Sequence, residues 1–295
     1  GLNALQHTAW QINTAVLDVM VTLWDNHSEL AGLPSRLGQE LPAKPFDIDT
    51  NLEARKVWKI ATAKVHLSNL GLKSQRIAFV GAVDVATRYG KFKKIFFPYQ
   101  LDFRGRIYAV PALNPQGADH HKALLRFANG KPLGDKGWRW LAVLGANLAG
   151  YDKVSFEDRV DWVLANSAEI CAIANDPYTN RGWCSSIGDV VVDKPWQFLA
   201  FAMEWAGYVE HGAGYVSKLP IAMDGSCSGL QHFSGMNLCE VGGKSVNLIP
   251  SDKPQDVYQL VADKVILLLQ QDLLTGTDDA VKHTADGVAW IDEGT

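Results

Sequence analysis

Apolar residues recur at helical spacing through the first thirty positions of the chain. The recurring residues are Leu5, Ala9, Ile12, Val16, Val19 and Leu23. Steps of three and four residues place such positions along one face of a helix. The pattern predicts a single helix over residues 3–30. Two glycines and three prolines between residues 32 and 45 predict that a loop follows it.

A second helical region precedes Gly90. Asn51 and the two polar residues before it stand just ahead of Glu53, an arrangement typical of a helix start. We expect helix over residues 52–70 and again over residues 74–89. Gly90 is the expected stop, because glycine commonly follows the last residue of a helix.

The pattern changes after residue 96. Charged and apolar residues alternate over residues 100–110, which predicts a strand pair, and Asn114-Pro-Gln-Gly117 predicts a turn. Residues 219–223 predict a short buried strand. Further helices are expected over 119–128, 135–149, 155–174, 195–211, 227–236 and 252–273, ahead of a polar, acidic tail over 275–295. The predicted fold class is mainly α with a small antiparallel β part, that is, α+β.

Composition places the chain among ordinary globular proteins. Of its 295 residues, 47% are hydrophobic and 20% charged, and the net charge is −4. Its four cysteines lack C-x-x-C spacing, which argues against a zinc site or a disulfide framework. No apolar run approaches the length of a membrane span, and the chain begins without the pattern of a signal peptide.

Positive charge is concentrated in one part of this acidic chain. Between Arg55 and Arg106 only Asp84 and Asp102 oppose the cations, which are Arg55, Lys56, Lys59, Lys64, Lys73, Arg76, Arg88, Lys91, Lys93, Lys94, Arg104 and Arg106. A block of this kind fits a local contact with a polyanion. A solvated helix face with its own surface ion pairs explains the charges equally well.

The strongest candidate for chemistry is Asp224, which follows the apolar run Leu219-Pro-Ile-Ala-Met223. A carboxylate at the tip of a buried strand is suited to bind a divalent metal, and the Gly225 carbonyl could supply a second oxygen. The small residues that follow suit an anion at a helix N-terminus. The alternative is that Asp224 is an ordinary helix N-cap.

The same turn also has the G-x-C-x-G form of a nucleophile elbow, with Cys227 in the position of the nucleophile. His232 is too close along the chain to serve as its base, and His283 lies in the polar tail. A cysteine hydrolase is therefore a weaker hypothesis.

A second cluster combines Arg104, Gly105 and Arg106 with flanking aromatic residues, including Tyr108. Arginine binds phosphates through two donors, and aromatic rings stack on bases. These residues indicate contact with nucleic acid. An amphipathic strand with outward arginines and inward aromatics remains the alternative.

Three other features of the sequence give weaker evidence about function. Gly145 to Gly150 has the glycine spacing of a phosphate-binding loop, but Tyr151-Asp152 replaces the Lys-Ser/Thr that the loop requires. His120 and His121 are expected to be surface histidines. Six tryptophans are expected to occupy the core and to line a groove rather than to bind a cofactor: Trp138, Trp140, Trp162, Trp183, Trp196 and Trp205.

Taken in order, these blocks resemble the single-subunit, bacteriophage-type DNA-dependent RNA polymerases. The similarity runs from about Asn3 to Asp278. Its blocks are Phe97-Pro-Tyr-x-x-Asp-x-Arg-Gly-Arg-x-Tyr-Ala-Val110, Asn114-Pro-Gln-Gly117, Gly145-Ala-Asn-x-Ala-Gly-x-Asp-Lys-Val154, Asp224-Gly-Ser-Cys-Ser-Gly-x-Gln-His-Phe-Ser234, Glu240-Val-Gly-Gly243 and Val246-Asn-Leu-x-Pro-Ser251.

The resemblance implies a partial right-hand polymerase that makes RNA on a DNA template from nucleoside triphosphates by a two-metal mechanism. Residues 1–90 would contain the thumb, residues 91–274 the palm portion with the first catalytic motif, and residues 275–295 a polar loop at the start of the fingers. Its place of action would be the cytoplasm of a phage-infected bacterium.

The resemblance also assigns residues. Asp224 matches a catalytic aspartate that binds two Mg²⁺ ions, and Gly225 the residue whose carbonyl also binds metal. The residues matched to template or hybrid binding are Arg104, Arg106, Tyr108, Lys122, Ser228, Lys73 and Arg76.

The chain departs from the family pattern after Asp224. Nothing downstream matches the second catalytic aspartate or the fingers helix that binds the incoming triphosphate. The expectation is therefore a central fragment, or one piece of a split polymerase, that is inactive alone. In a split polymerase, a second chain would supply the fingers and the second catalytic aspartate. A non-catalytic nucleic-acid-binding module is the alternative.

Overall fold

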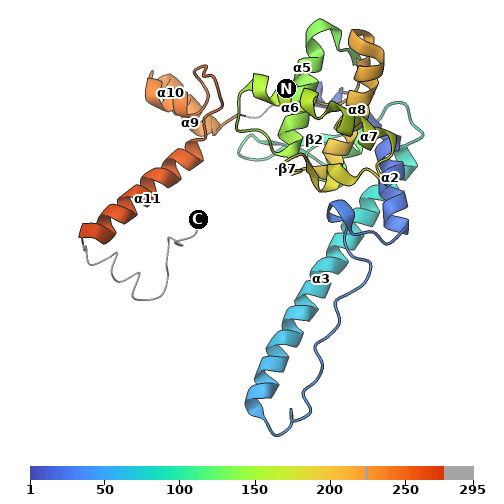
Figure 1. Ribbon diagram of the computed structural model, residues 1–295, viewed down its shortest axis with the longest axis vertical. Coiled ribbons are helices and arrows are strands. Elements are labelled where there is room, and N and C mark those ends of the chain that lie inside the picture. The colour runs from blue at the N-terminus through green and yellow to red at the C-terminus, as the bar shows by residue number, and fades with distance from the viewer. Residues whose placement is uncertain (223–224, 276–295) are drawn as a thin grey trace. The chain divides into compact units, whose positions relative to one another are not determined.

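The computed structural model describes residues 1–222 and 225–275, with side chains through residue 271 (Figure 1). The chain divides into two compact units. The first joins Gly1–Asp152 to Glu157–Ile221, and the second joins Lys153–Phe156 to the chain from Ala222 onward. Within the described residues the structure is mostly helical with small antiparallel sheets, as the α+β prediction required.

The N-terminal segment corrects the prediction of one helix over residues 3–30. It forms α1 (Leu2–Gln6), β1 (Trp10–Ile12), α2 (Thr14–Asp25) and the short 3₁₀ helix η1 (Leu30–Gly32). Strand β1 pairs antiparallel with β4 (Leu125–Phe127), and Trp10 also exchanges backbone hydrogen bonds with Ile95. Pairing with distant residues overrides the helical period, because the period reports only which side chains are buried.

Helix α3 (Leu52–Tyr89) is one continuous helix of 38 residues, so the predicted interruption near residue 71 is wrong. It begins where expected: the Asn51 side chain accepts a hydrogen bond from the Ala54 N–H at 3.0 Å. It ends at Gly90, also as expected. Gly71 lies inside the helix, and a glycine there costs only about 1 kcal/mol.

Four two-stranded antiparallel sheets occur among the described residues. The predicted strand pair is confirmed as the hairpin of β2 (Tyr99–Leu101) and β3 (Ile107–Ala109). The other pairs are β1 with β4, β5 (Lys131–Pro132) with β8 (Val216–Ser217), and β6 (Ser186–Ile187) with β7 (Val190–Val191). The helix predicted over 119–128 is therefore only α4 (Asp119–Ala123), because β4 follows at once.

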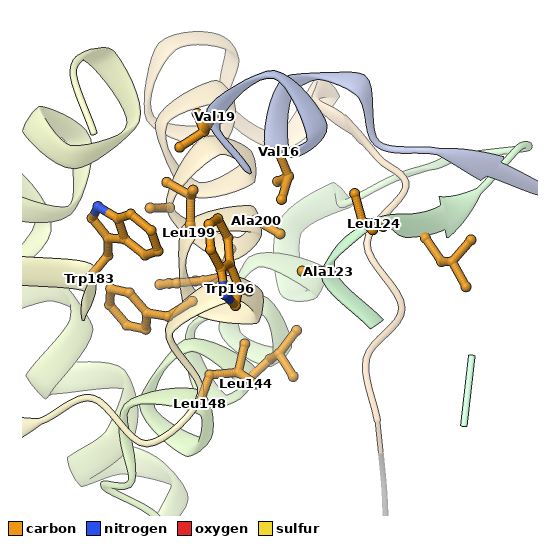
Figure 2. Close-up of a cluster of buried hydrophobic side chains, with 14 of the residues drawn as sticks. Val16, Val19, Ala123, Leu124, Leu144, Leu148, Trp183, Trp196, Leu199 and Ala200 are labelled. Carbon is orange, nitrogen blue, oxygen red and sulfur yellow. The ribbon is translucent and has the colours of Figure 1, made fainter. Parts of the chain in front are cut away.

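The core of the first unit is built around α8 (Pro195–His211), which packs against α4, α5 (Gly134–Ala149) and α7 (Ser167–Asn175). Figure 2 shows side chains of α2, α4, α5 and α8 gathered in one apolar cluster with Trp183. A Cβ added to Gly145 would lie 2.2 Å from the Phe201 ring. Gly145 is thus a packing glycine inside α5, and this agrees with the rejection of a phosphate-binding loop.

The helix predicted over 155–174 is divided into α6 (Phe156–Ala165) and α7, with Asn166 between them. The Asn166 side chain donates to the Trp162 carbonyl at 2.7 Å. The short 3₁₀ helices η2 (Arg181–Cys184) and η3 (Gly212–Gly214) complete this unit. Trp183, Trp196 and Trp205 are buried in its core, as predicted, whereas Trp140 is 43% exposed.

The second unit contains α9 (Ser228–Met236), α10 (Glu240–Ser245) and α11 (Val257–Thr275). The helix predicted over 227–236 is confirmed to within one residue. The next predicted helix begins five residues late, because Asn247 exchanges two hydrogen bonds with the Gln255 backbone, at 2.7 and 2.8 Å. That exchange fixes the preceding residues as a loop.

The buried strand predicted over 219–223 is also corrected. Residues 219–222 form no strand, and Ile221 is 39% exposed. An apolar run becomes a strand only where a neighbouring backbone pairs with it, and β8 ends at Ser217. No helix of the described residues is both long enough and apolar enough to cross a membrane.

Candidate functional site

The tip of the β2–β3 hairpin is organised by Asp102. One oxygen of its carboxylate accepts the backbone N–H groups of Arg104 and Arg106, each at 2.9 Å. The other oxygen accepts the Arg104 guanidinium at 3.0 Å. The Arg106 N–H and the contacts from Arg104 lower the pKa of Asp102. Gly105 completes the turn with a φ of +79°, a left-handed conformation that favours glycine.

Four side chains that suit nucleic acid are exposed on this hairpin. Arg106 and Phe103 lie at the tip, where Phe103 is 98% exposed, and Tyr108 on β3 is 40% exposed. Arg104 is also exposed, and its guanidinium pairs with Asp102 and lies 5.6 Å from the centre of the Phe103 ring. The hairpin therefore presents two cations and two aromatic rings on a backbone fixed by hydrogen bonds.

Gln116 holds the outer edge of β3, a role that the sequence did not reveal. Its amide oxygen accepts the Ala109 N–H at 2.6 Å, and its amide nitrogen donates to the Ile107 carbonyl at 2.9 Å. The side chain thus replaces a third strand. The only signal was its place in Asn114-Pro-Gln-Gly117, which we interpreted as a turn.

Lys122 is exposed on α4, and Asp119 anchors that helix. The Asp119 carboxylate accepts the backbone N–H groups of Trp196 and Gln197, at 2.8 and 3.1 Å, at the start of α8. Burial raises the pKa of Asp119. Lys122 is therefore carried by a short helix fastened to the core.

The adjacent histidines are half-buried, which corrects the prediction of surface residues. Burial, together with the neighbouring His121, lowers the pKa of His120 to about 4. The His120 ring packs 5.7 Å from that of Phe79 on α3. A Cβ on Gly117 would lie 2.2 Å from His121 Nδ1, so the turn at Gly117 leaves room for the second ring.

Lys73 and Arg76 lie on α3, one exposed and one half-buried. Helix geometry places Arg55, Lys59 and Lys73 within about 40° of one another around the axis. Arg76 instead turns to the adjacent loop and donates to the Arg36 carbonyl. Helix α3 thus presents a row of cations, while Arg76 binds it to the loop that contains Arg36.

Residues 33–51 run beside α3 and form what we call the strap (Figure 1). Asn69 exchanges two hydrogen bonds with the Gln39 backbone, at 2.7 and 2.9 Å. Trp58 Nε1 donates to the Pro42 carbonyl at 2.9 Å. These contacts are polar, and they lie along the part of α3 that the core does not bury.

In the second unit, the turn over residues 225–228 leads into α9. Ser226 Oγ accepts the Asn247 side chain at 2.7 Å, and Cys227 caps α9 with a φ of +57°. Gly225 and Ser228 are exposed. Asn247, which the sequence did not single out, therefore braces both this turn and the loop before α11.

Asp224 itself lies outside the described residues. Within the part of the chain that the structure describes, no group of three His, Cys, Asp or Glu side chains could hold a metal ion. The expected donors are the Asp224 carboxylate and the Gly225 carbonyl. Both are hard oxygens, and the donor chemistry fits Mg²⁺.

The cysteine-hydrolase hypothesis gains no support from the structure. A nucleophile elbow joins a strand to a helix, and residues 219–222 are not a strand. His232 lies on α9, the helix that Cys227 caps. That placement keeps it too local for the role of general base.

The structure brings some of the predicted residues together. Arg104, Arg106 and Tyr108 share one hairpin, and Lys122, Lys73 and Arg76 belong to the same unit. Gly225 and Ser228 belong to the second unit.

Comparison with known proteins gives a consistent result. A family model described as DNA-dependent RNA polymerase matches residues 131–289. T7 RNA polymerase of Escherichia phage T7 is 45% identical over 97% of this chain and 32% of its own length. A DNA-directed RNA polymerase of Enterobacteria phage T3 has the same identity and coverage.

A more distant relative is the mitochondrial DNA-directed RNA polymerase of Neurospora crassa, which is 37% identical over 92% of this chain and 19% of its own length. The chain spans about a third of the length of the phage relatives that it matches, since it covers 32% of each.

Proposed function

The chain belongs to the phage-type DNA-dependent RNA polymerases, and we propose that it takes part in DNA-templated RNA synthesis by two-metal nucleotidyl transfer. The observation that carries this proposal is the similarity over 97% of the chain to a phage RNA polymerase. The hydrogen-bonded Arg104–Arg106 hairpin supports it, because a preorganised cationic tip suits the backbone of a nucleic acid.

We propose Asp224 as the catalytic carboxylate and Gly225 as a carbonyl ligand beside it. When bound, Mg²⁺ would stabilise the charge that develops on the attacking and leaving oxygens. The chain itself supplies the oxygen donors and the turn that presents them. Asn247 fixes that turn through Ser226.

The remaining proposed residues contact the template and the hybrid. Arg106 and Tyr108 would bind phosphate and stack on a base from the hairpin, with Arg104 beside them. Ser228 would act from the start of α9. Lys122 would act from α4, and Lys73 and Arg76 from α3, where the cationic row suits a phosphate backbone.

In the right-hand architecture that we propose, residues 1–90 contain the thumb and residues 91–274 the palm portion. The loop assigned to residues 275–295 lies outside the described residues except for its first residue. The phage relatives point to the cytoplasm of a phage-infected bacterium as the place of action.

The relatives are about three times as long as this chain, which covers 32% of their length. We therefore propose that it works with further polymerase segments, on the same or on a second chain, and is inactive alone. Those segments would supply the second carboxylate, because one aspartate cannot hold two metal ions in catalytic geometry.

Primer extension on a primed DNA template tests the function. In the polymerase that contains this chain, Asp224→Asn should lower Mg²⁺-dependent nucleotide incorporation by about 10³-fold or more. Asp252→Asn, an exposed residue in the same unit, is the matched control and should leave incorporation unchanged.

Two results would contradict the proposal. Full incorporation by Asp224→Asn would favour a non-catalytic nucleic-acid-binding module. Robust incorporation by residues 1–295 alone would refute the need for further segments.

A further inference from the structure

Helix α3 has a second support besides the core. The core buries it only near its C-terminal end. Further along, Asn69 binds the Gln39 backbone of the strap, and Trp58 Nε1 donates to the Pro42 carbonyl. The strap therefore accompanies a long part of α3 that the core leaves uncovered (Figure 1).

The direction of the strap is set at one bend. The chain bends at residues 36–37 and then runs over residues 38–45 without a further turn or bend. This straight part lies close to α3, because Asn69 exchanges two hydrogen bonds with its backbone, at 2.7 and 2.9 Å. A Cβ on Gly38 would lie 3.1 Å from Asn69 Oδ1, so a glycine suits this close approach.

Arg36 binds three parts of the first unit together at this bend. Its guanidinium donates to Asp25 Oδ1 of α2 at 3.1 Å and lies 4.4 Å from the centre of the Trp24 ring. Its backbone carbonyl accepts the guanidinium of Arg76 on α3. The Arg36 side chain is 28% exposed, so solvent screens these contacts only in part.

The contacts of Arg36 adjoin the place where the core holds α3. The centre of the Trp24 ring lies 4.9 Å from that of Phe79. The chain approaches the strap through Ala31, whose φ of +54° is left-handed and whose carbonyl accepts Trp196 Nε1 of α8 at 3.0 Å. The core therefore fixes the approach to the strap, and Arg36 fixes its bend.

The row of cations on α3, which comprises Arg55, Lys59 and Lys73, lies beyond this base. Cations hold a phosphate backbone by displacing its counterions, and those ions return when the cations move away. Since the core buries α3 only near one end, a small change of angle there moves the row by a large distance. A fixed direction of α3 is thus a condition for steady binding.

We propose that Arg36 is a positioning residue for this row: it fixes the bend of the strap, and the strap fixes the direction of α3. This inference rests on the proposed function, in which α3 binds the phosphate backbone of the hybrid. Arg36 acts through Asp25, Trp24 and the strap, without itself contacting nucleic acid.

A direct phosphate contact by Arg36 is the competing explanation, and Asp25 separates the two. Asp25→Asn weakens the hold on the Arg36 guanidinium. If Arg36 positions the row, this substitution should weaken binding of the hybrid. If Arg36 binds phosphate, the same substitution should strengthen binding, because it frees a cation and removes a negative charge beside it.

The test uses the polymerase that contains this chain, with an RNA primer annealed to a DNA template as the probe. Arg36→Met keeps a long unbranched side chain near Trp24 and should speed dissociation of the hybrid about five- to tenfold. Asp25→Asn should speed it about two- to threefold, since a partly exposed ion pair contributes less. At saturating hybrid, kcat should stay unchanged, because neither residue is placed at the reacting atoms.

Asp18→Asn is the matched control, because it removes an exposed carboxylate from the same helix, α2. It should not speed dissociation. The inference is overturned if Asp25→Asn holds the hybrid as tightly as this control or more tightly. It is also overturned if Arg36→Met releases the hybrid at the wild-type rate.

The direction of α3 can also be measured without nucleic acid. Nitroxide labels on Glu53→Cys of α3 and Asp161→Cys of α6, both exposed positions of the first unit, report the distance between the far end of α3 and the core. The four natural cysteines are first replaced by alanine. Electron paramagnetic resonance should give a broader distance distribution in Arg36→Met than in the wild type.

The two measurements separate this inference from the proposed function. If the wild type neither makes RNA nor holds the hybrid, the proposed function fails, whatever the label distances show. If the wild type is active and Arg36→Met leaves the distance distribution unchanged, the inference is overturned.

A role in overall stability alone would give a different result. It would lower the unfolding temperature and the fraction of active enzyme, while the remaining molecules released the hybrid at the wild-type rate. That outcome also contradicts a positioning role for Arg36.

Discussion

Helices α8 and α3 are stabilised by different kinds of contact. Eight of the 17 residues of α8 are buried, whereas α3 buries only Phe79, Ala82 and Ala86 among 38. Close apolar packing holds α8, and polar contacts with the strap accompany the exposed length of α3. The first unit therefore contains a tightly packed centre and a long helix, α3, which this centre buries only near the C-terminal end of the helix.

Substitution of glycine should have opposite effects in the two regions. Gly145→Ala should destabilise the protein by about 3 kcal/mol, because its Cβ would overlap the Phe201 ring on α8. Gly71→Ala on α3 meets no atom within 4 Å. It should stabilise the protein by about 0.5–1 kcal/mol. Thermal unfolding measures both, and effects of equal sign would contradict the contrast.

Loss of the hydrogen bonds between the strap and α3 should have an intermediate effect on local stability. Asn69→Leu removes both hydrogen bonds to the Gln39 backbone, and local opening should become easier by about 1–2 kcal/mol. Hydrogen exchange at the Gln39 amide should speed up about tenfold or more. Leu70→Ala, at a position that is 65% exposed, is the control. Unchanged exchange in Asn69→Leu would show that the strap does not depend on this side chain.

The smallest expected effect is a pH dependence of stability at the contact between His120 of α4 and Phe79 of α3. Because burial lowers the folded-state pKa of His120 to about 4, below the ordinary histidine pKa of 6.5, the unfolded chain takes up a proton first as the pH falls. Stability is complete above pH 6.5 and declines as the pH falls towards 4. Solvent still reaches the ring, so we expect a loss of about 1 kcal/mol by pH 5.

The measurement is the unfolding temperature at pH 7.5 and pH 5. His120→Phe keeps a ring beside Phe79 and should remove most of this decline. An equal decline in the variant would assign the pH dependence to other groups.

Sequence reasoning located elements whose signals are local. Helix α8 was predicted with its observed bounds. Its first turn contains Pro195 and Gly212 follows its end, so both of its boundaries are marked locally. The Arg104–Arg106 hairpin was found from alternation and a glycine. Helix α9 was found from the small residues that precede it.

Two of the errors share one cause, which is the presence or absence of strand pairing with a distant segment. Residues 10–12 carry a helical period yet form a strand with residues 125–127. Residues 219–222 are apolar yet have no strand neighbour. Periodicity records which residues are buried, and it does not identify the backbone that will supply hydrogen bonds.

The candidate functional site shows the same division between local signals and contacts with distant residues. Charged and aromatic residues on the hairpin were visible, but the roles of Gln116 and Asn247 were not. Each of these two binds backbone or side-chain groups that the sequence places up to 21 positions away. A single sequence carries no signal for such contacts, so the residues that fix the site are harder to find than those that would act in it.

The long helix has a mechanical consequence. From Phe79, where the core holds it, α3 extends 27 residues to Leu52. At 1.5 Å per residue this arm is about 40 Å long. A rotation of about 5° at the base would carry the far end about 3.5 Å, roughly the spacing of neighbouring base pairs. A small rotation around Phe79 would thus move the far end of α3 by about the rise of one base pair.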